Sequence, residues 1–280
     1  MSSHFETLLR NACLTTDAAA VSSKLVPVMP ERYTELRGGD KHRLSSASAL
    51  SRFDSDSIPE RIEGAIAPHF VVPGRLIKVH LPDADIRYFS QLFSDQQVKE
   101  YLRKLTLDKN SSKWDKLGKG RLVAQWSRPG GIKYVFSDDE YIAKSFPEFV
   151  EEIRLKVIEI LSPIYGKSMT DFNYCVCNCY LNGSAGVNWH TDAEPHLVPG
   201  YPIACVSFGS DRVFSLARIP RIVSEPVRSE LNLRLESGSL LVMAGDTQSH
   251  FLHAIAKEAS VKNVRFSLTF RVNFIHPPSL

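Results

Sequence analysis

Hydrophobic and polar residues follow a regular pattern only from about residue 75 onward. Residues 75–80 alternate in the manner of a strand, and residues 86–105 carry hydrophobic side chains at roughly helical spacing. A second helix is predicted over residues 146–161, where Phe149, Ile153, Val157, Ile158 and Leu161 share one face. A strand and a helix are therefore expected to open the folded part of the chain, with a second helix after them.

Short polar and aromatic segments lie between the two predicted helices, and short apolar segments follow the second. Residues 118–137 surround Pro129-Gly130-Gly131 and predict a β hairpin whose turn lies at the glycines. Strands are predicted over residues 173–181, 203–208, 213–219, 239–243 and 264–274. Helices followed by a series of short strands indicate an α+β protein whose C-terminal half is a β sandwich or barrel.

Residues 1–70 have a different texture. They are rich in Ser, Asp, Glu and Arg, contain few aromatic residues and show no sustained periodicity. Such a stretch predicts a loosely ordered extension. We therefore expect an N-terminal extension over residues 1–70, an N-terminal segment over residues 71–145 and a β-rich core over residues 146–280.

The composition is that of an ordinary soluble protein, and it excludes little. The formal net charge of +3 permits a polyanionic partner without arguing for one. No run of about 18 apolar residues occurs, so we expect no membrane span. The five cysteines (Cys13, Cys175, Cys177, Cys179 and Cys205) form no CxxC pair and follow no secretory leader, which predicts reduced thiols and an intracellular protein.

The first candidate for chemistry is His190-Thr191-Asp192. In an extended segment, residues two apart point to the same side, so an imidazole and a carboxylate there can reach one ion. A third ligand must come from elsewhere, and His196, His250, His253 and His276 are the candidates downstream. Two histidines and one carboxylate are the ligands of non-haem iron(II) oxygenases. A surface or structural pair is the alternative reading of an isolated HxD.

The last predicted strand has one apolar face and one polar face. Phe266, Leu268, Phe270 and Val272 form the first, and Arg265, Ser267, Thr269, Arg271 and Asn273 form the second. The polar face is expected to meet either solvent or a polar cavity. In a cavity, two guanidinium groups on one side of a strand can bind a dicarboxylate such as 2-oxoglutarate.

Residues 172–180 alternate in the same way. Asn178 and Tyr180 lie on one face of this predicted strand, and Cys175, Cys177 and Cys179 lie on the other. Neighbouring cysteines on one side of a strand converge poorly on a tetrahedral ion. We therefore expect the three cysteines to be core residues.

With these motifs in hand, residues 75–274 resemble the AlkB family of iron(II)- and 2-oxoglutarate-dependent dioxygenases, especially its eukaryotic DNA-repair members. The motifs are Asn178-Cys-Tyr180, His190-Thr-Asp192, residues 199–209, residues 238–241, His253, and Arg265-Phe-Ser-Leu-Thr-Phe-Arg271. The resemblance implies a double-stranded β-helix, or jelly-roll, core with flanking helices. It also implies a nucleotide-recognition lid within residues 71–145.

The resemblance further implies roles for individual residues. His190, Asp192 and His253 would bind Fe(II), with His253 preferred over His250 by the family register. Asn178, Tyr180, Arg265 and Arg271 would contact 2-oxoglutarate, and O2 would be the second co-substrate. Ser267 stands where the family often has Asn, so one hydrogen bond to the co-substrate is missing or replaced.

Substrate contacts are implied as well. Trp126, Tyr134 and Phe136 match the lid, where an aromatic ring stacks on a base flipped out of the helix. Arg121 would contact a phosphate or base, and Glu194 the exocyclic nitrogen of the damaged base. Packing for the rings, a solvated arginine and a surface carboxylate are the alternatives.

The function implied is oxidative dealkylation of N-alkylated bases of the 1-methyladenine and 3-methylcytosine type in DNA, by direct reversal. The same chemistry on RNA, a metabolite or a protein is one alternative, and a catalytically silent nucleic-acid-binding member is another. The expected partner is alkylated DNA, with RNA as the alternative. A monomer in the nucleus, or else in the cytoplasm, is expected.

Overall fold

The computed structural model describes residues 74–274, except residues 113, 118–119, 132, 137–138, 195, 221–226 and 228. The N-terminal extension predicted over residues 1–70 lies outside the described residues, as does His276. In the N-terminal part, the elements are β1 (Ile77–Val79), β2 (Asp85–Phe89), α4 (Asp95–Ser111), β3 (Asp115–Lys116), β4 (Arg121–Ser127), β5 (Lys133–Phe136), β6 (Asp139–Ile142) and β7 (Lys144–Ser145).

After these come α5 (Glu148–Tyr165), a 3-10 turn (Ser168–Thr170), β8 (Tyr174–Tyr180), β9 (Val187–His190), β10 (Ile203–Gly209), β11 (Arg212–Arg218), β12 (Ser229–Leu235), β13 (Leu240–Ala244), α6 (Thr247–His250), β14 (Phe251–Ile255) and β15 (Arg265–Arg271). In the part of the chain that the structure describes, the two long helices precede the run of strands β8–β15, as the sequence predicted, but seven short strands lie before or between them.

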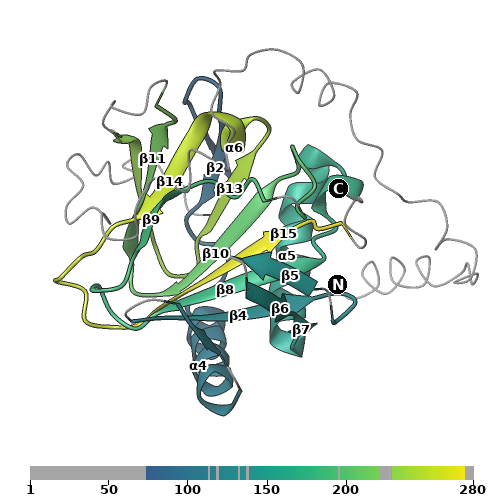
Figure 1. Cartoon of the computed structure of the whole chain (residues 1–280), viewed down its shortest axis with the longest axis vertical. Helices are drawn as coiled ribbons and strands as arrows, with labels where there is room; N and C mark the ends of the chain where they lie inside the picture. Colours follow the sequence, from purple (N-terminus) through teal and green to yellow (C-terminus); the bar gives the residue numbers. More distant parts are fainter. Residues whose placement is uncertain are drawn as a thin grey trace, which may run out of the picture. The chain divides into compact units, whose positions relative to one another are not determined.

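Two mainly antiparallel sheets form the centre of the fold (Figure 1). The large sheet runs β1-β2-β13-β10-β15-β8-β4-β3, with β7 beside β4, and the small sheet runs β12-β11-β14-β9. A hydrophobic cluster joins them, with Tyr88 and Leu241 from the large sheet and Leu216, Leu233 and Phe251 from the small one. Burial of apolar surface between two sheets is what stabilises a sandwich. The α+β sandwich expected from the sequence is confirmed.

Helices α4 and α5 cover the other face of the large sheet. Phe266, Leu268 and Phe270 of β15 are completely buried in a second cluster with Val157 and Leu161 of α5. Cys175, Cys177 and Cys179 of β8 belong to the same cluster, so the core role predicted for them is confirmed. The polar face of β15 consequently points toward the small sheet.

Two local predictions were wrong. Residues 86–89, assigned to a helix, belong to strand β2, which pairs with β1 and β13. A turn does lie at Gly130 and Gly131, but the strands on either side of it form no hairpin, because β4 pairs with β3, β7 and β8 while β5 pairs with β6. A Cβ at Gly130 would collide with Ser145, so glycine there permits the close approach of two segments.

The helix that follows β2 begins at a capping box. The Ser94 hydroxyl accepts a hydrogen bond from the Gln97 N–H, and the Gln97 side chain accepts one from the Ser94 N–H. These bonds satisfy two backbone donors that a helix start otherwise leaves open. They explain why α4 begins at Asp95 and not at the apolar residues before it.

We expect Ser94→Ala to lower the free energy of unfolding by about 1 kcal/mol, because it removes this cap from an exposed position. Urea unfolding measures the change. Ser111→Ala, at the other end of α4, removes only a hydroxyl bonded to the Leu107 carbonyl and serves as the control. Equal effects of the two substitutions would contradict a capping role for Ser94.

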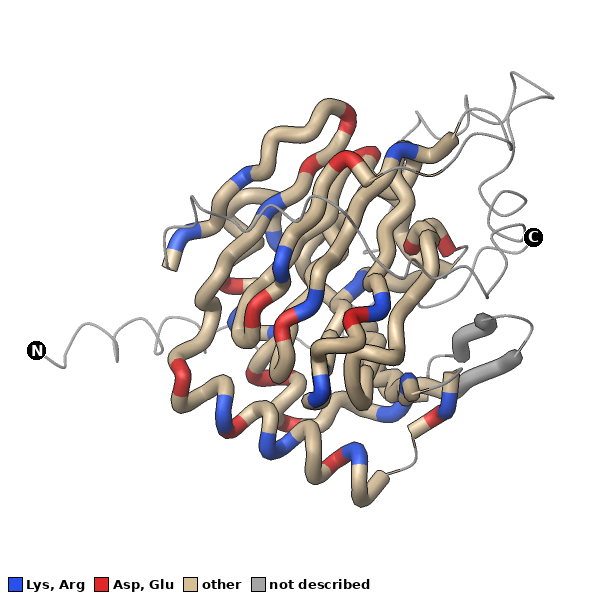
Figure 2. The backbone as a smooth tube through the Cα atoms, turned by 90° about the vertical axis from the view of Figure 1, so that its left-hand side faces the viewer, with Lys and Arg blue, Asp and Glu red and all other residues tan. Residues whose placement is uncertain are grey.

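Charges are mixed along the surface of α4. Figure 2 shows basic and acidic residues interleaved along this helix at the bottom of the view, and Glu100 pairs there with Arg103 and Lys104. The outer face of α4 is therefore a solvated one. No helix in the described part of the chain combines the length and the apolar character needed to cross a membrane.

Candidate active site

Three predicted metal ligands meet on the inner side of the small sheet. His190 ends β9 and lies opposite His253 of the adjacent strand β14, so the pairing of these strands brings both imidazoles together. Asp192 follows two residues later, with its Oδ1 3.9 Å from His190 Nε2 and its Oδ2 3.8 Å from His253 Nε2. One ligand atom from each residue lies within 4.8 Å of the others. His196 and His250 do not belong to this cluster, so the geometry selects His253 as the third ligand.

Neighbouring groups orient the two imidazoles. Nδ1 of His190 lies 2.8 Å from the Asn188 carbonyl oxygen, and since a carbonyl only accepts, Nδ1 carries the proton and Nε2 keeps its lone pair. Burial, assisted by the nearby His190, lowers the pKa of His253 to about 3, so its ring is neutral at pH 7. The ring also stacks on Phe214, with the centroids 5.5 Å apart. Both rings are therefore oriented with Nε2 toward Asp192, where these nitrogens can bind a metal.

Asp192 is held as a carboxylate. Burial by itself raises its pKa, but the positive charge of Arg271 and the two imidazoles outweigh burial and lower the pKa below its usual value. Arg271 Nη2 donates a 2.6 Å hydrogen bond to Asp192 Oδ1, and the Asp192 N–H donates to Gln248 Oε1. The chain thus presents two imidazoles and one carboxylate as donors, a set that suits Fe(II) with three open positions.

Arg265 carries an uncompensated charge on the inner face of the large sheet. Its side chain is 1% exposed, and Nη2 donates to Ser207 Oγ at 2.9 Å. Nε and Nη1 have no hydrogen-bond partner, and no carboxylate pairs with this guanidinium, among the residues that the structure describes. A buried, unpaired cation is costly unless a ligand satisfies it. Its two open donors fit one carboxylate of a dicarboxylate.

The other residues predicted for 2-oxoglutarate lie on the same two strands. Tyr180 is paired with Arg265 in the sheet register, and its ring centroid is 5.2 Å from the Arg265 guanidinium carbon. Asn178 is paired with Ser267, whose hydroxyl lies 3.0 Å from the Cys205 thiol. The polar face of β15 is therefore buried and does not meet solvent, which was one of the two alternatives.

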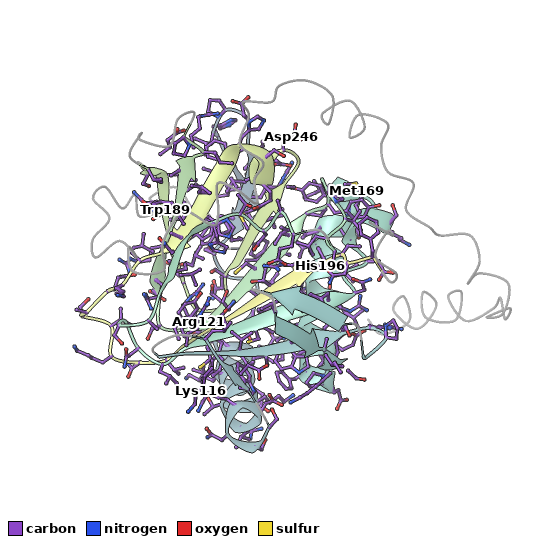
Figure 3. All side chains as sticks on the ribbon, in the orientation of Figure 1. Lys116, Arg121, Met169, Trp189, His196 and Asp246 are labelled. Atoms are coloured by element: carbon purple, nitrogen blue, oxygen red, sulfur yellow. The ribbon has the colours of Figure 1, made fainter. Side chains whose placement is uncertain are left out.

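The residues predicted to contact the substrate do not all lie near the metal ligands. Arg121 Nη1 donates a 3.4 Å hydrogen bond to Asn178 Oδ1, which places Arg121 (labelled in Figure 3) beside the residues predicted for 2-oxoglutarate. The stacking role of Trp126 is not supported. Its ring is 2% exposed and packs against Trp114 in the cluster beneath the helices, on the opposite face of the sheet from the triad.

Glu194 lies close to the triad, as the predicted substrate role requires. Its Oε2 is 3.4 Å from Arg271 Nη1 and 2.9 Å from Nε2 of His196, which Figure 3 labels. Tyr134 and Phe136 lie on β5, and their side chains fall outside the described residues.

Sequence reasoning missed the groups that support the site. Asn188, Gln248 and Ser207 each bond a site residue, and none of them was predicted as one, although Ser207 lies in the motif over residues 199–209. Asn188 bonds His190 through its backbone carbonyl, which any residue would supply, so its side chain carried no signal for this contact.

Comparison with known proteins supports the chemistry that this geometry suggests. The sequence model of the 2OG-Fe(II) oxygenase superfamily matches residues 85–271. The mouse protein named DNA oxidative demethylase ALKBH2 is 30% identical over 244 residues, which cover 85% of this chain and 92% of the mouse protein. The chain belongs to the AlkB family of iron(II)- and 2-oxoglutarate-dependent oxygenases. Its cofactor is therefore Fe(II), and its co-substrates are 2-oxoglutarate and O2.

Other AlkB-family proteins match over shorter stretches. Human alpha-ketoglutarate-dependent dioxygenase alkB homolog 3 is 35% identical over 109 residues, 38% of each chain. Among solved structures, one titled "The structure of OsALKBH1" superposes with a TM-score of 0.51 at 19% identity, covering 70% of this chain and 99% of the other. That likeness concerns the fold alone. Together with the family match, it confirms the predicted jelly-roll core.

Proposed function

We propose that this AlkB-family oxygenase removes methyl groups oxidatively from N-alkylated bases of the 1-methyladenine and 3-methylcytosine type in DNA, by direct reversal. The observation that carries the proposal is the complete donor set at His190, Asp192 and His253, on the same interior as the open guanidinium of Arg265. Two groups of relatives carry AlkB-type names, and the mouse protein is named a DNA oxidative demethylase.

In this proposal the side chains of the protein bind and orient the metal and the co-substrate. His190, Asp192 and His253 hold the metal from one side, and Arg265, with Tyr180 and Asn178, binds 2-oxoglutarate. Arg271, which was also predicted to contact 2-oxoglutarate, donates a 2.6 Å hydrogen bond to Asp192 and in this proposal holds that ligand in its orientation. When bound, iron with 2-oxoglutarate and O2 supplies the oxidation that hydroxylates an N-methyl carbon, after which formaldehyde is lost. The buried surroundings of Asp192 and His253 exclude water from that chemistry.

The burial of the triad gives the direction of substrate approach. The His190 side chain is 35% exposed, whereas those of Asp192 and His253 are 4% and 9% exposed. A base flipped from a nucleic acid would therefore reach the metal from the side of His190. Glu194, with 22% of its side chain exposed, is placed to meet such a base through its carboxylate.

The deciding experiment supplies purified protein with iron(II), ascorbate and 2-oxoglutarate, and measures succinate and the repaired base. Single-stranded DNA, duplex DNA and RNA, each with 1-methyladenine or 3-methylcytosine, are compared with unmethylated strands. We expect methylated DNA to give the greatest stimulation. Repair confined to RNA would replace the DNA proposal, and wild-type activity no higher than that of His190→Ala would indicate a silent member.

We expect Glu194→Gln to lower kcat/KM for methylated DNA by about 10-fold, because it removes a charged hydrogen-bond acceptor worth about 1.5 kcal/mol or more. The KM for 2-oxoglutarate should stay within about twofold of wild type, since Glu194 does not adjoin Arg265. Steady-state repair kinetics measure both values. A rise in the 2-oxoglutarate KM alone would place Glu194 at the co-substrate and not at the base.

The proposal extends to the setting of the protein. A DNA substrate implies a nuclear location, which imaging of the tagged full chain tests. We further propose that the protein acts as a monomer, which sedimentation velocity tests.

A further inference from the structure

Arg212, the first residue of β11, has no exposed surface and is not among the predicted site residues. Its Nε lies 3.2 Å from Glu258 Oε1, and its Nη2 donates to the carbonyl oxygens of Ala185, at 2.8 Å, and Ala256. Nη1 reaches the Asn182 carbonyl oxygen at 3.4 Å. Every nitrogen of this guanidinium therefore has an acceptor, and Glu258 balances its charge.

The acceptors belong to two loops that carry the site. Residues 181–186 join β8, which ends at Tyr180, to β9, which ends at His190. Residues 256–264 join β14, which contains His253, to β15, which begins at Arg265. Arg212 thus connects the β8–β9 loop to the β14–β15 loop, and all four of these strands carry predicted site residues.

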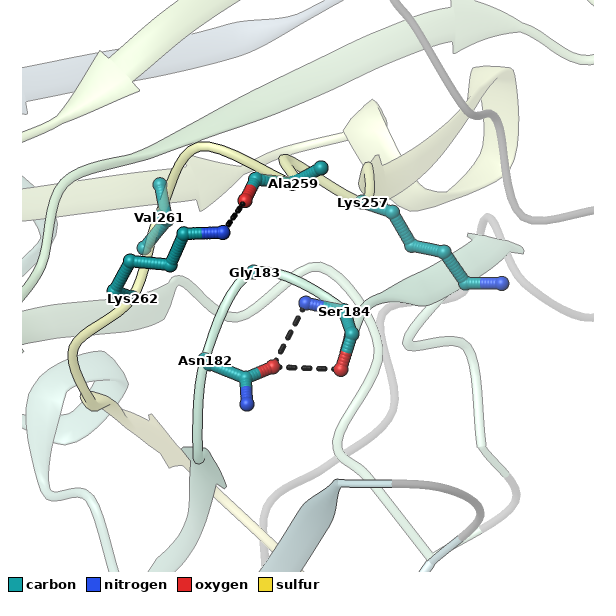
Figure 4. Close-up of a pocket in the computed structure, with 7 residues that line it drawn as sticks. All are labelled: Asn182, Gly183, Ser184, Lys257, Ala259, Val261 and Lys262. Atoms are coloured by element: carbon teal, nitrogen blue, oxygen red, sulfur yellow. Dashed lines mark hydrogen bonds between the residues drawn. The ribbon is translucent and has the colours of Figure 1, made fainter.

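The same two loops are fastened directly to each other. The Gly183 N–H donates to the Val261 carbonyl, and the Glu258 N–H donates to the Gly183 carbonyl. A Cβ at Gly183 would overlap the Glu258 carbonyl, so only glycine permits this approach. Figure 4 shows the loops facing each other across a surface pocket lined by Asn182, Gly183, Ser184, Lys257, Ala259, Val261 and Lys262.

Arg212 also contacts the residue next to Arg265. Its guanidinium carbon lies 5.7 Å from the Tyr180 ring centroid, and that of Arg265 lies 5.2 Å from the same centroid. The two arginines differ in their pairing: Arg212 is fully satisfied, whereas Nε and Nη1 of Arg265 are open. The Tyr180 ring is thus held by Arg212, whose own position is determined by its bonds to the two loops.

We propose that Arg212 is a positioning residue for 2-oxoglutarate: it fixes Tyr180 and both loops so that the open nitrogens of Arg265 face the distal carboxylate. The inference rests on the proposed Arg265 contact. A group that holds a binding residue in its productive orientation contributes to affinity without touching the ligand.

The alternative is that Arg212 only fastens the fold. A purely structural arginine would lower the melting temperature on substitution, and the molecules that remain folded would bind 2-oxoglutarate normally. A positioning arginine changes the KM for 2-oxoglutarate far more than kcat. The split between these constants separates the two roles.

The test compares Arg212→Gln and Arg212→Lys in succinate production by the iron-loaded full chain with a methylated single-stranded oligonucleotide. We expect Arg212→Gln to raise the KM for 2-oxoglutarate about 10-fold with kcat within about threefold of wild type. Arg212→Lys keeps the positive charge but loses the planar guanidinium, so its KM should lie between those of the wild type and Arg212→Gln. The control is Arg234→Gln, because Arg234 lies 3.4 Å from the other oxygen of Glu258 and is 40% exposed; its KM should stay near wild type.

A wild-type KM for Arg212→Lys with a lowered melting temperature would overturn the inference, and this variant decides the matter if Arg212→Gln does not fold. Arg265→Gln is assayed in parallel. If Arg265→Gln leaves the KM unchanged, the proposed co-substrate contact fails and the inference fails with it. If only Arg265→Gln raises the KM, the contact stands and the role of Arg212 is structural.

Discussion

His253→Ala is expected to lower 2-oxoglutarate turnover by more than about 100-fold. Removing a group that only hydrogen-bonds to a metal ligand lowers activity by up to about 100-fold, and removing the ligand itself should lower it further. The substitution takes away one of three donors at a site where His253 and Asp192 are buried, so water cannot replace the imidazole without rearrangement. Succinate production and iron retained after gel filtration measure the result. Both should fall together, because the loss of the metal causes the loss of turnover.

His250→Ala is the matched control for this prediction. His250 ends α6, three residues before His253, and was the rival third ligand by spacing. It lies outside the cluster of metal-ligating atoms in the described part of the chain. Iron retention and turnover should stay within about twofold of wild type, and the reverse pattern would show that the third ligand is misassigned.

The choice between these histidines illustrates which features of the site were visible in the sequence. His190 and Asp192 could be paired locally, because strand geometry alone puts residues two apart on one side. His253 could not, because its position depends on the register between β9 and β14, which is a tertiary feature. The family resemblance supplied that register, and the geometry agrees with it.

Strand alternation was informative where one face of a strand is apolar and the other is mainly polar. In β15 the apolar face predicted the helix-covered side, and the polar face with Arg265 followed. In β4, alternation places Trp126 on an apolar face with Leu122 and Ala124, so the pattern itself indicated a ring packed in the core, whereas the family resemblance had assigned it to the lid. Strand β9 escaped prediction because its four residues, although they alternate, are too few to give a clear period.

Arg265→Gln is expected to raise the KM for 2-oxoglutarate about 100-fold. Charged hydrogen bonds contribute about 1.5–3 kcal/mol each, and two nitrogens of Arg265 are free to bond the carboxylate, so the substitution should remove about 3 kcal/mol of binding free energy. Steady-state kinetics at saturating methylated DNA measure the KM. Arg154→Gln is the control, since Arg154 is equally buried but is paired with Glu151 and Asp171; its KM should not change.

Stability separates this prediction from simple misfolding. In the absence of 2-oxoglutarate, a buried and unpaired charge destabilises the fold, so Arg265→Gln should melt at the wild-type temperature or above it. Arg154→Gln should melt lower, because it leaves Glu151 without its strongest partner. Addition of 2-oxoglutarate should then raise the melting temperature of the wild type and of Arg154→Gln but not that of Arg265→Gln. A 2-oxoglutarate shift retained by Arg265→Gln would mean that another cation binds the co-substrate.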